Sequence, residues 1–166
     1  DWSSDVCSSD LLGSVVYVGA DRFADLGAQD GKHFLDLFEL GLANPNEYPY
    51  EEAWICSRYF QNNPVLSKLP VCKGITINTV HGEEKSIAGI IERYHPDIES
   101  MEGAAVVHVA HLHGIAAGEV RGISNLVTNR DKSAWKLREA AAADDPNLHR
   151  HQITLSTKRL PSFSRK

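Results

Sequence analysis

The chain has 166 residues, of which 42% are hydrophobic and 23% are charged, and its formal net charge is -5. This length and balance suit one domain with a real hydrophobic core, and they argue against a nucleic-acid binder, which normally presents a basic surface. No apolar run reaches membrane-spanning length and no segment has the order of a signal peptide, so we expect neither a membrane nor a nucleic acid as a partner.

The N-terminal segment, residues 1–11, reads DWSSDVCSSDL and has no hydrophobic periodicity. It resembles a common sequencing-library adapter translated into protein over its whole length, although a disordered tail is the plainer interpretation. The adapter interpretation predicts that this segment is not native and that the natural N-terminal part of the protein is absent.

The middle of the chain alternates between strand-like and helix-like segments. In chain order we expect a strand at 15–18, a short helix at 30–42, a loop at 43–50, a strand at 73–80, a helix at 83–94 stopped by Pro96, a strand at 98–100, a helix at 104–113 ended by Gly114, a strand at 119–123 and an alanine-rich helix at 132–143. This alternation predicts an α/β domain over 12–143 with a mixed or mainly parallel sheet.

The C-terminal segment, residues 144–166, is predicted to be a tail. From His149 to Lys166 it contains five Lys and Arg residues and no Asp or Glu. A flexible basic tail and an out-of-frame peptide both remain open, and neither makes it a nucleic-acid arm.

The first motif with chemical content is Glu99-Ser-Met-Glu-Gly-Ala-Ala105. Ser100 is placed to cap the following helix, which would put the Glu102 carboxylate in the first turn, where the helix dipole favours it. A carboxylate can accept two hydrogen bonds from a ribose diol, and Met101 can pack under a sugar or a base. The ordinary alternatives are a dipole-stabilising glutamate and a core methionine.

The second motif is Arg121-Gly-Ile-Ser-Asn125, interpreted as a strand end that opens onto a polar loop. Ligands of α/β sheets bind at strand ends, and the Asn125 amide, next to Ser124, can bind the N7 and O6 edge of a 6-oxopurine. A loop asparagine that bonds its own backbone is the alternative. Val80 and His81, just after a predicted strand, are placed to line the same pocket, although His81 can equally be a solvated loop residue.

The remaining candidates for metal or cofactor binding are weak. His108, His111 and His113 lack an HExxH pattern, and only the first two share a helical face, so we expect no metal. No GxGxxG or P-loop is present, and we expect no cofactor. Cys7, Cys56 and Cys72 are odd in number and lack metal-like spacing, which is typical of reduced thiols in a cytoplasmic protein.

Six stretches resemble the nucleoside phosphorylase and nucleosidase superfamily, and within it most closely the futalosine hydrolase family. They are RFADLGAQDG at 22–31, FLDLFELGL at 34–42, GITINTVHG at 74–82, ESMEGAA at 99–105, ISN at 123–125 and SNLVTNRDKSAWK at 124–136. The resemblance implies an incomplete three-layer fold with a central twisted mixed sheet. It also implies hydrolysis of the N-glycosidic bond of futalosine, releasing hypoxanthine in menaquinone biosynthesis, by a protein that is a homodimer when full length.

The resemblance also assigns roles to particular residues. Glu102 would bind the ribose hydroxyls, Met101 would pack on the ribose, and Asn125 would occupy the place of an acid that protonates N7 in adenosine-type nucleosidases. The glutamate that activates water in this family has no match here, so we expect the 166 residues alone to have no turnover. A methylthioadenosine-type nucleosidase, a purine nucleoside phosphorylase and a non-catalytic nucleoside-binding protein remain alternatives.

Overall fold

The computed structural model describes residues 11–57 and 63–128 in full and residues 154–159 as backbone. A seven-stranded sheet occupies its centre, in the order β4-β5-β1-β6-β7-β9-β8. The strands are β1 (Val15–Asp21), β4 (Tyr50–Glu51), β5 (Trp54–Cys56), β6 (Val71–Thr76), β7 (Ile98–Ser100), β8 (Glu119–Leu126) and β9 (Thr154–Arg159). The predicted α/β fold with a central mixed sheet is thereby confirmed.

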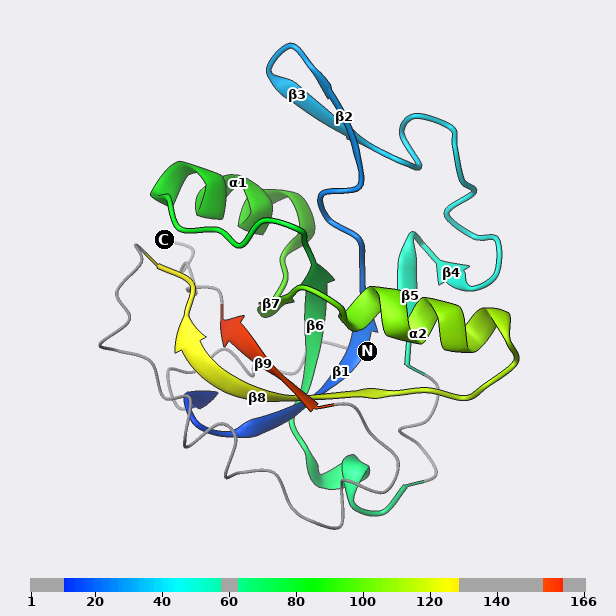
Figure 1. The fold of residues 1–166 in the computed structure, drawn as a ribbon, viewed down its shortest axis with the longest axis vertical. Coiled ribbons are helices and arrows are strands. Elements are labelled where there is room, and N and C mark those ends of the chain that lie inside the picture. Colours follow the sequence, from blue (N-terminus) through cyan, green and yellow to red (C-terminus); the bar gives the residue numbers. More distant parts are fainter. Residues whose placement is uncertain (1–10, 58–62, 129–153, 160–166) are drawn as a thin grey trace.

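The sheet curves back on itself through β1 (Figure 1). This strand pairs in parallel with β6 along one edge, while its other edge pairs antiparallel with β8 at Val15–Val18 and with β5 at Ala20 and Asp21. Because strands far apart in the sequence meet at β1, no sequence pattern predicted this closure. β1 is accordingly seven residues long, although the sequence predicted only its first four.

Two helices pack against the sheet, α1 (Glu84–Tyr94) and α2 (Gly103–Leu112), and a short 3-10 turn, η3, spans Leu66–Lys68. Helix α1 begins as predicted, because the Glu83 side chain accepts a hydrogen bond from the Ser86 amide at 3.0 Å. It ends where His95 adopts the left-handed conformation, with φ 47°.

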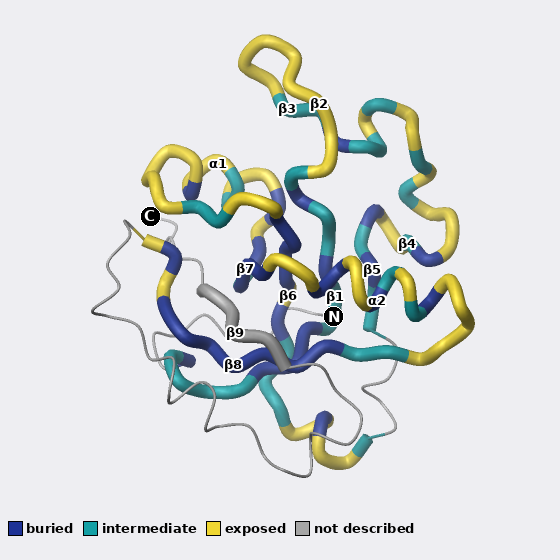
Figure 2. Tube along the Cα trace, viewed as in Figure 1, coloured by how far each residue is buried: buried dark blue, intermediate teal, exposed yellow. Residues whose placement is uncertain are grey.

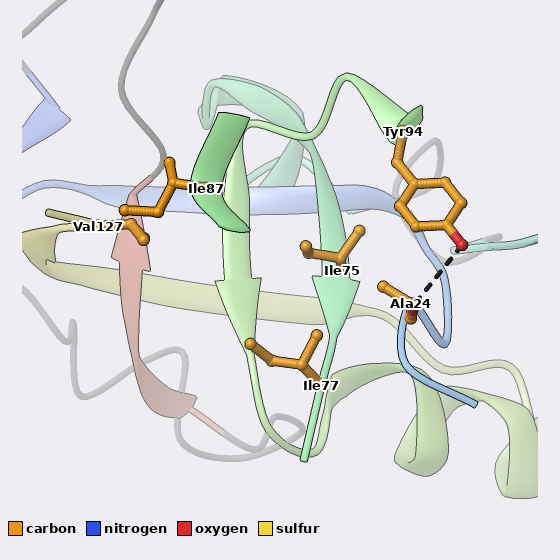
Figure 3. Packing of buried hydrophobic residues seen from close by; sticks show 6 residues of the cluster. All are labelled: Ala24, Ile75, Ile77, Ile87, Tyr94 and Val127. Atoms are coloured by element: carbon orange, nitrogen blue, oxygen red, sulfur yellow. Dashed lines mark hydrogen bonds between the residues drawn. The ribbon is translucent and has the colours of Figure 1, made fainter. Parts of the chain in front are cut away.

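One hydrophobic cluster joins α1 to the sheet (Figure 3). Its buried members are Ala24, Ile75, Ile77, Ile87, Tyr94 and Val127. The Tyr94 hydroxyl donates to the Ala24 carbonyl at 3.5 Å, so its polar end is satisfied inside the cluster. Burying each isoleucine contributes about 1.5–3 kcal/mol, which makes this cluster a main anchor of α1.

The predicted helix at 30–42 is wrong. Residues there form a hairpin of β2 (Gly27–Asp30) and β3 (His33–Asp36), followed by a turn. Gly31 takes a positive φ of 58° at the hairpin turn, and the Asp36 carboxylate accepts from the amides of Phe38 and Glu39 at 2.9 Å. These local bonds outweigh the apolar spacing, and the hairpin projects from the sheet with mostly exposed residues (Figure 2).

Other boundaries differ by a few residues. β6 ends at Thr76 instead of 80, β8 continues to Leu126, and α2 begins one residue earlier than predicted. β4 and β5 were not predicted, and β4 begins within the predicted loop at 43–50.

The chain ends give three results. The predicted helix at 132–143 and residues 1–10 lie outside the described residues, whereas Leu11 is buried beside Val16 and Val18. β9 falls within the predicted tail and lies between β7 and β8. In the described part of the chain, neither helix has the length and apolar character needed to cross a bilayer.

Candidate active site

The first motif forms the junction between β7 and α2. Ser100 is the last residue of the strand and Gly103 the first of the helix, so Met101 and Glu102 form a two-residue link. The cap position falls on Glu102, which corrects the expected capping role of Ser100, but the Ser100 hydroxyl still accepts from the Gly103 amide at 3.3 Å. Met101 is 50% exposed, which excludes the core-packing alternative, and Glu102 is exposed beside it.

The second motif does not open onto a loop. Ser124 and Asn125 are buried within β8, and the β8–β9 register shifts between Ile123 and Asn125. Pairing with β9 extends the strand beyond the predicted end, and such an irregularity re-aims side chains. The Asn125 Oδ1 accepts from the Ser124 hydroxyl at 2.9 Å, and its Nδ2 donates to the Leu126 carbonyl at 2.9 Å.

Arg121 connects the two motifs. Its Nη2 donates to the Ser100 hydroxyl oxygen at 3.4 Å, across from β8 to the end of β7. Thr76, at the end of β6, joins the same group: its Oγ1 lies 3.5 Å from the Ser100 hydroxyl and accepts from the Ala104 amide at 2.8 Å. The structure therefore brings the motifs together at the N-terminus of α2, although Met101, Glu102 and Asn125 do not bond one another.

A buried acidic pair lies next to Gly103, at the junction between β7 and α2. Asp21 from β1 and Glu119 from β8 are both almost fully buried, and their carboxylate oxygens lie closer than 3.0 Å to the position that a Cβ on Gly103 would occupy. Burial, the nearby Glu119 charge and a hydrogen bond to Glu119 together hold the pKa of Asp21 well above its ordinary value. Glu119 also pairs with the Arg121 Nε, which supplies the partner that a buried glutamate requires.

The sequence analysis identified neither Asp21 nor Glu119 as part of the site. The only available signal was the charged pair Glu119 and Arg121, two residues apart in a strand and therefore on the same face. Two buried atoms of this cluster, Oε2 of Glu119 and Nη1 of Arg121, have no hydrogen-bond partner among the described residues.

The predicted pocket residues Val80 and His81 lie in the loop that follows β6. Val80 is half-buried and packs against the α1 cluster, so its side chain belongs at least partly to the core. The His81 backbone amide and ring Nδ1 lie 3.1 and 2.8 Å from the two carboxylate oxygens of Glu99. Glu99 opens the first motif, but its role was not predicted.

His108 and His111 take structural positions, and so does Arg22, the first residue of the RFADLGAQDG stretch. The ring of His111 is buried and stacks on Tyr48, and burial lowers the pKa of His108, which lies against the ring of Tyr50. Within residues 11–57 and 63–128, no group of three His, Cys, Asp or Glu side chains is arranged to hold a metal. Arg22 is paired with Asp36 at 2.5 Å.

Comparison with known proteins matches the sequence of the chain to one family. The sequence profile described as the phosphorylase superfamily matches residues 55–155. The chain is 33% identical over 140 residues to futalosine hydrolase of Streptomyces coelicolor, with 80% of the chain and 54% of that relative covered. Futalosine hydrolase of Acidothermus cellulolyticus is 34% identical over 131 residues, with 76% and 52% covered.

A third relative, futalosine hydrolase of Thermus thermophilus, is 29% identical over 142 residues, with 80% of the chain and 58% of the relative covered. The chain thus spans about half the length of the curated relatives that it matches. A solved structure of an MTA/SAH nucleosidase superposes with a TM-score of 0.55 at 22% identity, covering 81% of the chain and 50% of that structure, which shows a shared fold.

Proposed function

The chain belongs to the phosphorylase superfamily, and we propose that the protein hydrolyses the N-glycosidic bond of futalosine, releasing hypoxanthine in menaquinone biosynthesis. The observation that carries this proposal is the bond from Arg121 to Ser100 at 3.4 Å, which joins the two motifs at the start of α2. The three futalosine hydrolases among its relatives support this substrate.

The sugar side of the site is assigned to the β7–α2 link. Glu102 is exposed at the N-terminal end of α2, where the helix dipole favours a carboxylate that accepts hydrogen bonds from two ribose hydroxyls. The exposed thioether of Met101 supplies an apolar surface for the ribose ring. Ser100 contributes by holding this link in place through Gly103 and Arg121.

The base side of the site is assigned to Asn125, held by Ser124. One amide hydrogen of Asn125 donates to Leu126, which leaves the second to donate to N7 of the purine. Cleavage through an oxocarbenium-like transition state places negative charge on the departing base, and a donor at N7 stabilises it. An amide cannot transfer a proton, which favours a 6-oxopurine because its anion leaves more readily than that of adenine.

Water rather than phosphate is proposed as the nucleophile. Each of the three arginines in residues 11–57 and 63–128 is paired with a carboxylate: Arg22 with Asp36, Arg93 with Glu39, and Arg121 with Glu119. The Glu119 carboxylate already balances the charge of the buried Arg121 guanidinium, which disfavours a phosphate dianion there. This arrangement favours hydrolysis over phosphorolysis.

The full-length protein is further proposed to form a homodimer and to act in the cytoplasm. Helix α2 and the short segment after its C-terminus leave several large apolar side chains exposed, which suits a face that a second copy covers. They are Val106, Val109, Leu112 and Ile115. Sedimentation velocity measures the assembly directly, and a monomer at micromolar concentration would count against it.

The test is an assay of a protein that carries these residues at the full length of the relatives. With futalosine it should release hypoxanthine at the same rate with and without phosphate, and the sugar product should carry no phosphate. Asn125→Ala should lower kcat/KM by about 10²–10³, the usual cost of losing one donor aimed at developing charge. Asn125→Asp keeps the side-chain size and should shift the preference towards 6-aminopurine nucleosides.

Two results would contradict the proposal. Formation of a sugar phosphate that depends on phosphate would make the protein a phosphorylase. Unchanged hypoxanthine release by the Asn125→Ala variant would remove the assigned role of the amide.

A further inference from the structure

The loop after β6 is fixed at its end by a buried carboxylate. Glu99 lies on β7 with a side chain that has 0% exposure, and both of its oxygens face one residue. The His81 backbone amide donates to Oε1 at 3.1 Å, and the ring Nδ1 lies 2.8 Å from Oε2. One residue therefore satisfies a carboxylate that would be costly to leave unpaired in the core.

A second carboxylate fixes the start of the same loop. The Asp25 side chain accepts from the Asn78 backbone amide at 2.5 Å and from its Nδ2 at 3.0 Å. The Ile77 amide donates to the Ser100 carbonyl at 3.0 Å, so the loop runs beside the last residue of β7. His81 is thereby held next to the strand that leads directly into Met101 and Glu102.

The geometry defines which ring nitrogen of His81 remains available. A carboxylate only accepts hydrogen bonds, so the nitrogen facing Glu99, Nδ1, carries the hydrogen, and Nε2 of the neutral ring then presents a lone pair. None of the described residues bonds Nε2. The His81 side chain keeps 17% exposure, whereas that of Glu99 is fully buried.

An acceptor at this position distinguishes between purines. In hypoxanthine attached through N9, the atoms N3, N7 and O6 accept hydrogen bonds, and N1–H is the one N–H donor of the base. In a 6-aminopurine, N1 carries a lone pair instead. A lone pair on Nε2 therefore attracts the first base and repels the second at N1.

We propose that His81 accepts a hydrogen bond from N1–H of a 6-oxopurine nucleoside through Nε2, with Glu99 as the positioning residue that fixes its tautomer. The proposal rests on the proposed function for the substrate class. It adds a second hydrogen bond to the base, at the edge next to the edge that is assigned to Asn125. It assigns a side chain of this chain to base selection and gives the buried Glu99 a role beyond packing.

The experiment combines binding with nitrogen NMR on a protein that carries these residues at the full length of the relatives. Inosine should bind about tenfold more tightly than 1-methylinosine, which lacks N1–H, because one hydrogen bond of this kind is lost. His81→Asn keeps an amide near the Nδ1 position for Glu99 but removes Nε2, so inosine binding should weaken about tenfold while 1-methylinosine binding stays the same. The ¹⁵N shifts of the wild-type ring should show the Nδ1–H tautomer.

Glu99→Gln provides the readout for positioning. It preserves side-chain size, but its amide can donate as well as accept, so both ring tautomers should appear in the ¹⁵N spectrum and the preference for inosine over 1-methylinosine should fall. Circular dichroism and the urea midpoint of His81→Asn provide the folding control.

The outcomes separate this proposal from the proposed function. An Nε2–H tautomer in the wild-type chain, or a His81→Asn variant that binds inosine as the wild type does, would overturn the role of His81 and leave the function standing. A full-length wild-type protein that binds neither nucleoside would overturn the proposed function and this inference with it.

Discussion

Replacing Gly103 with alanine tests whether the acidic pair fixes the N-terminus of α2. Gly103 is the first residue of the helix and its φ is not positive, so its backbone does not require glycine. A Cβ there would lie closer than 3.0 Å to carboxylate oxygens of Asp21 and Glu119. Both side chains are buried and each is bonded through at least one oxygen, so they cannot move aside without breaking the contacts with Thr76 and Arg121.

The expected size of the effect follows from two opposing terms. Alanine gains about 1 kcal/mol over glycine in a helix, whereas overpacking a rigid buried site costs about 1–3 kcal/mol. We take the upper end because the neighbours are bonded side chains in a closed cluster, which gives a net loss of about 2 kcal/mol. For a chain of this size that corresponds to a fall in Tm of about 4–8 °C.

Gly89 provides the matched control for this measurement. It is exposed within α1, and a Cβ there would meet nothing within 4 Å. Gly89→Ala should therefore raise stability by about 0.5–1 kcal/mol, opposite in sign to Gly103→Ala. Urea titration at a constant m-value measures both variants. A Gly103→Ala variant as stable as Gly89→Ala would refute the reasoning, because the cluster would then have room for the methyl group.

Three further predictions concern buried side chains. Burial and Glu119 raise the pKa of Asp21 above 3.8, so the folded chain retains a proton that the unfolded chain releases. The stability that this proton contributes is lost as the pH rises through the pKa of Asp21 in the folded chain. The urea midpoint of Asp21→Asn relative to wild type should therefore increase with pH, and a difference that is constant from about pH 4 to pH 8 would exclude this. Arg22→Lys should lower the free energy of unfolding by about 1–2 kcal/mol in chemical denaturation, because the lysine ammonium cannot stack 4.7 Å from the Tyr94 ring centroid while it pairs with Asp36. An unchanged urea midpoint would show that the planar guanidinium is not needed. Burial raises the pKa of the Cys72 thiol, so iodoacetamide should label Cys72 only after unfolding, and mass spectrometry that finds the native chain alkylated there would contradict its burial.

The local elements that the sequence predicted well are those with strong periodicity and clear ends. The isoleucines of α1 recur at helical spacing, and Glu83 and His95 cap that helix within one residue of the prediction. The strand before Ser100 and the helix after it were predicted to within a residue. The hairpin of β2 and β3 was missed because its apolar residues fit a helical pattern, while the turn at Gly31 and the bonds to Asp36 decided the structure.

The candidate site was predicted in its residues more than in its geometry. Met101 and Glu102 lie exposed at a strand–helix junction, as a ligand-binding role requires. Asn125 was expected on an open loop but lies buried in β8, because pairing with β9 extends the strand past the motif. Glu99 was recognised only as the first residue of a motif. Nothing in the sequence reveals that its carboxylate contacts the side chain of His81.

The sequence by itself determined the chemical groups of the site and their approximate place along the chain. The helical and strand periods put Ser100, Glu102 and Asn125 near the ends of elements. Only the tertiary structure decided which of these groups meet. The contacts of Arg121 with Ser100, Asp21 with Glu119, and His81 with Glu99 all join different strands or loops. Such contacts depend on the order and closure of the sheet, which is set by long-range packing and leaves no periodic signal along the chain.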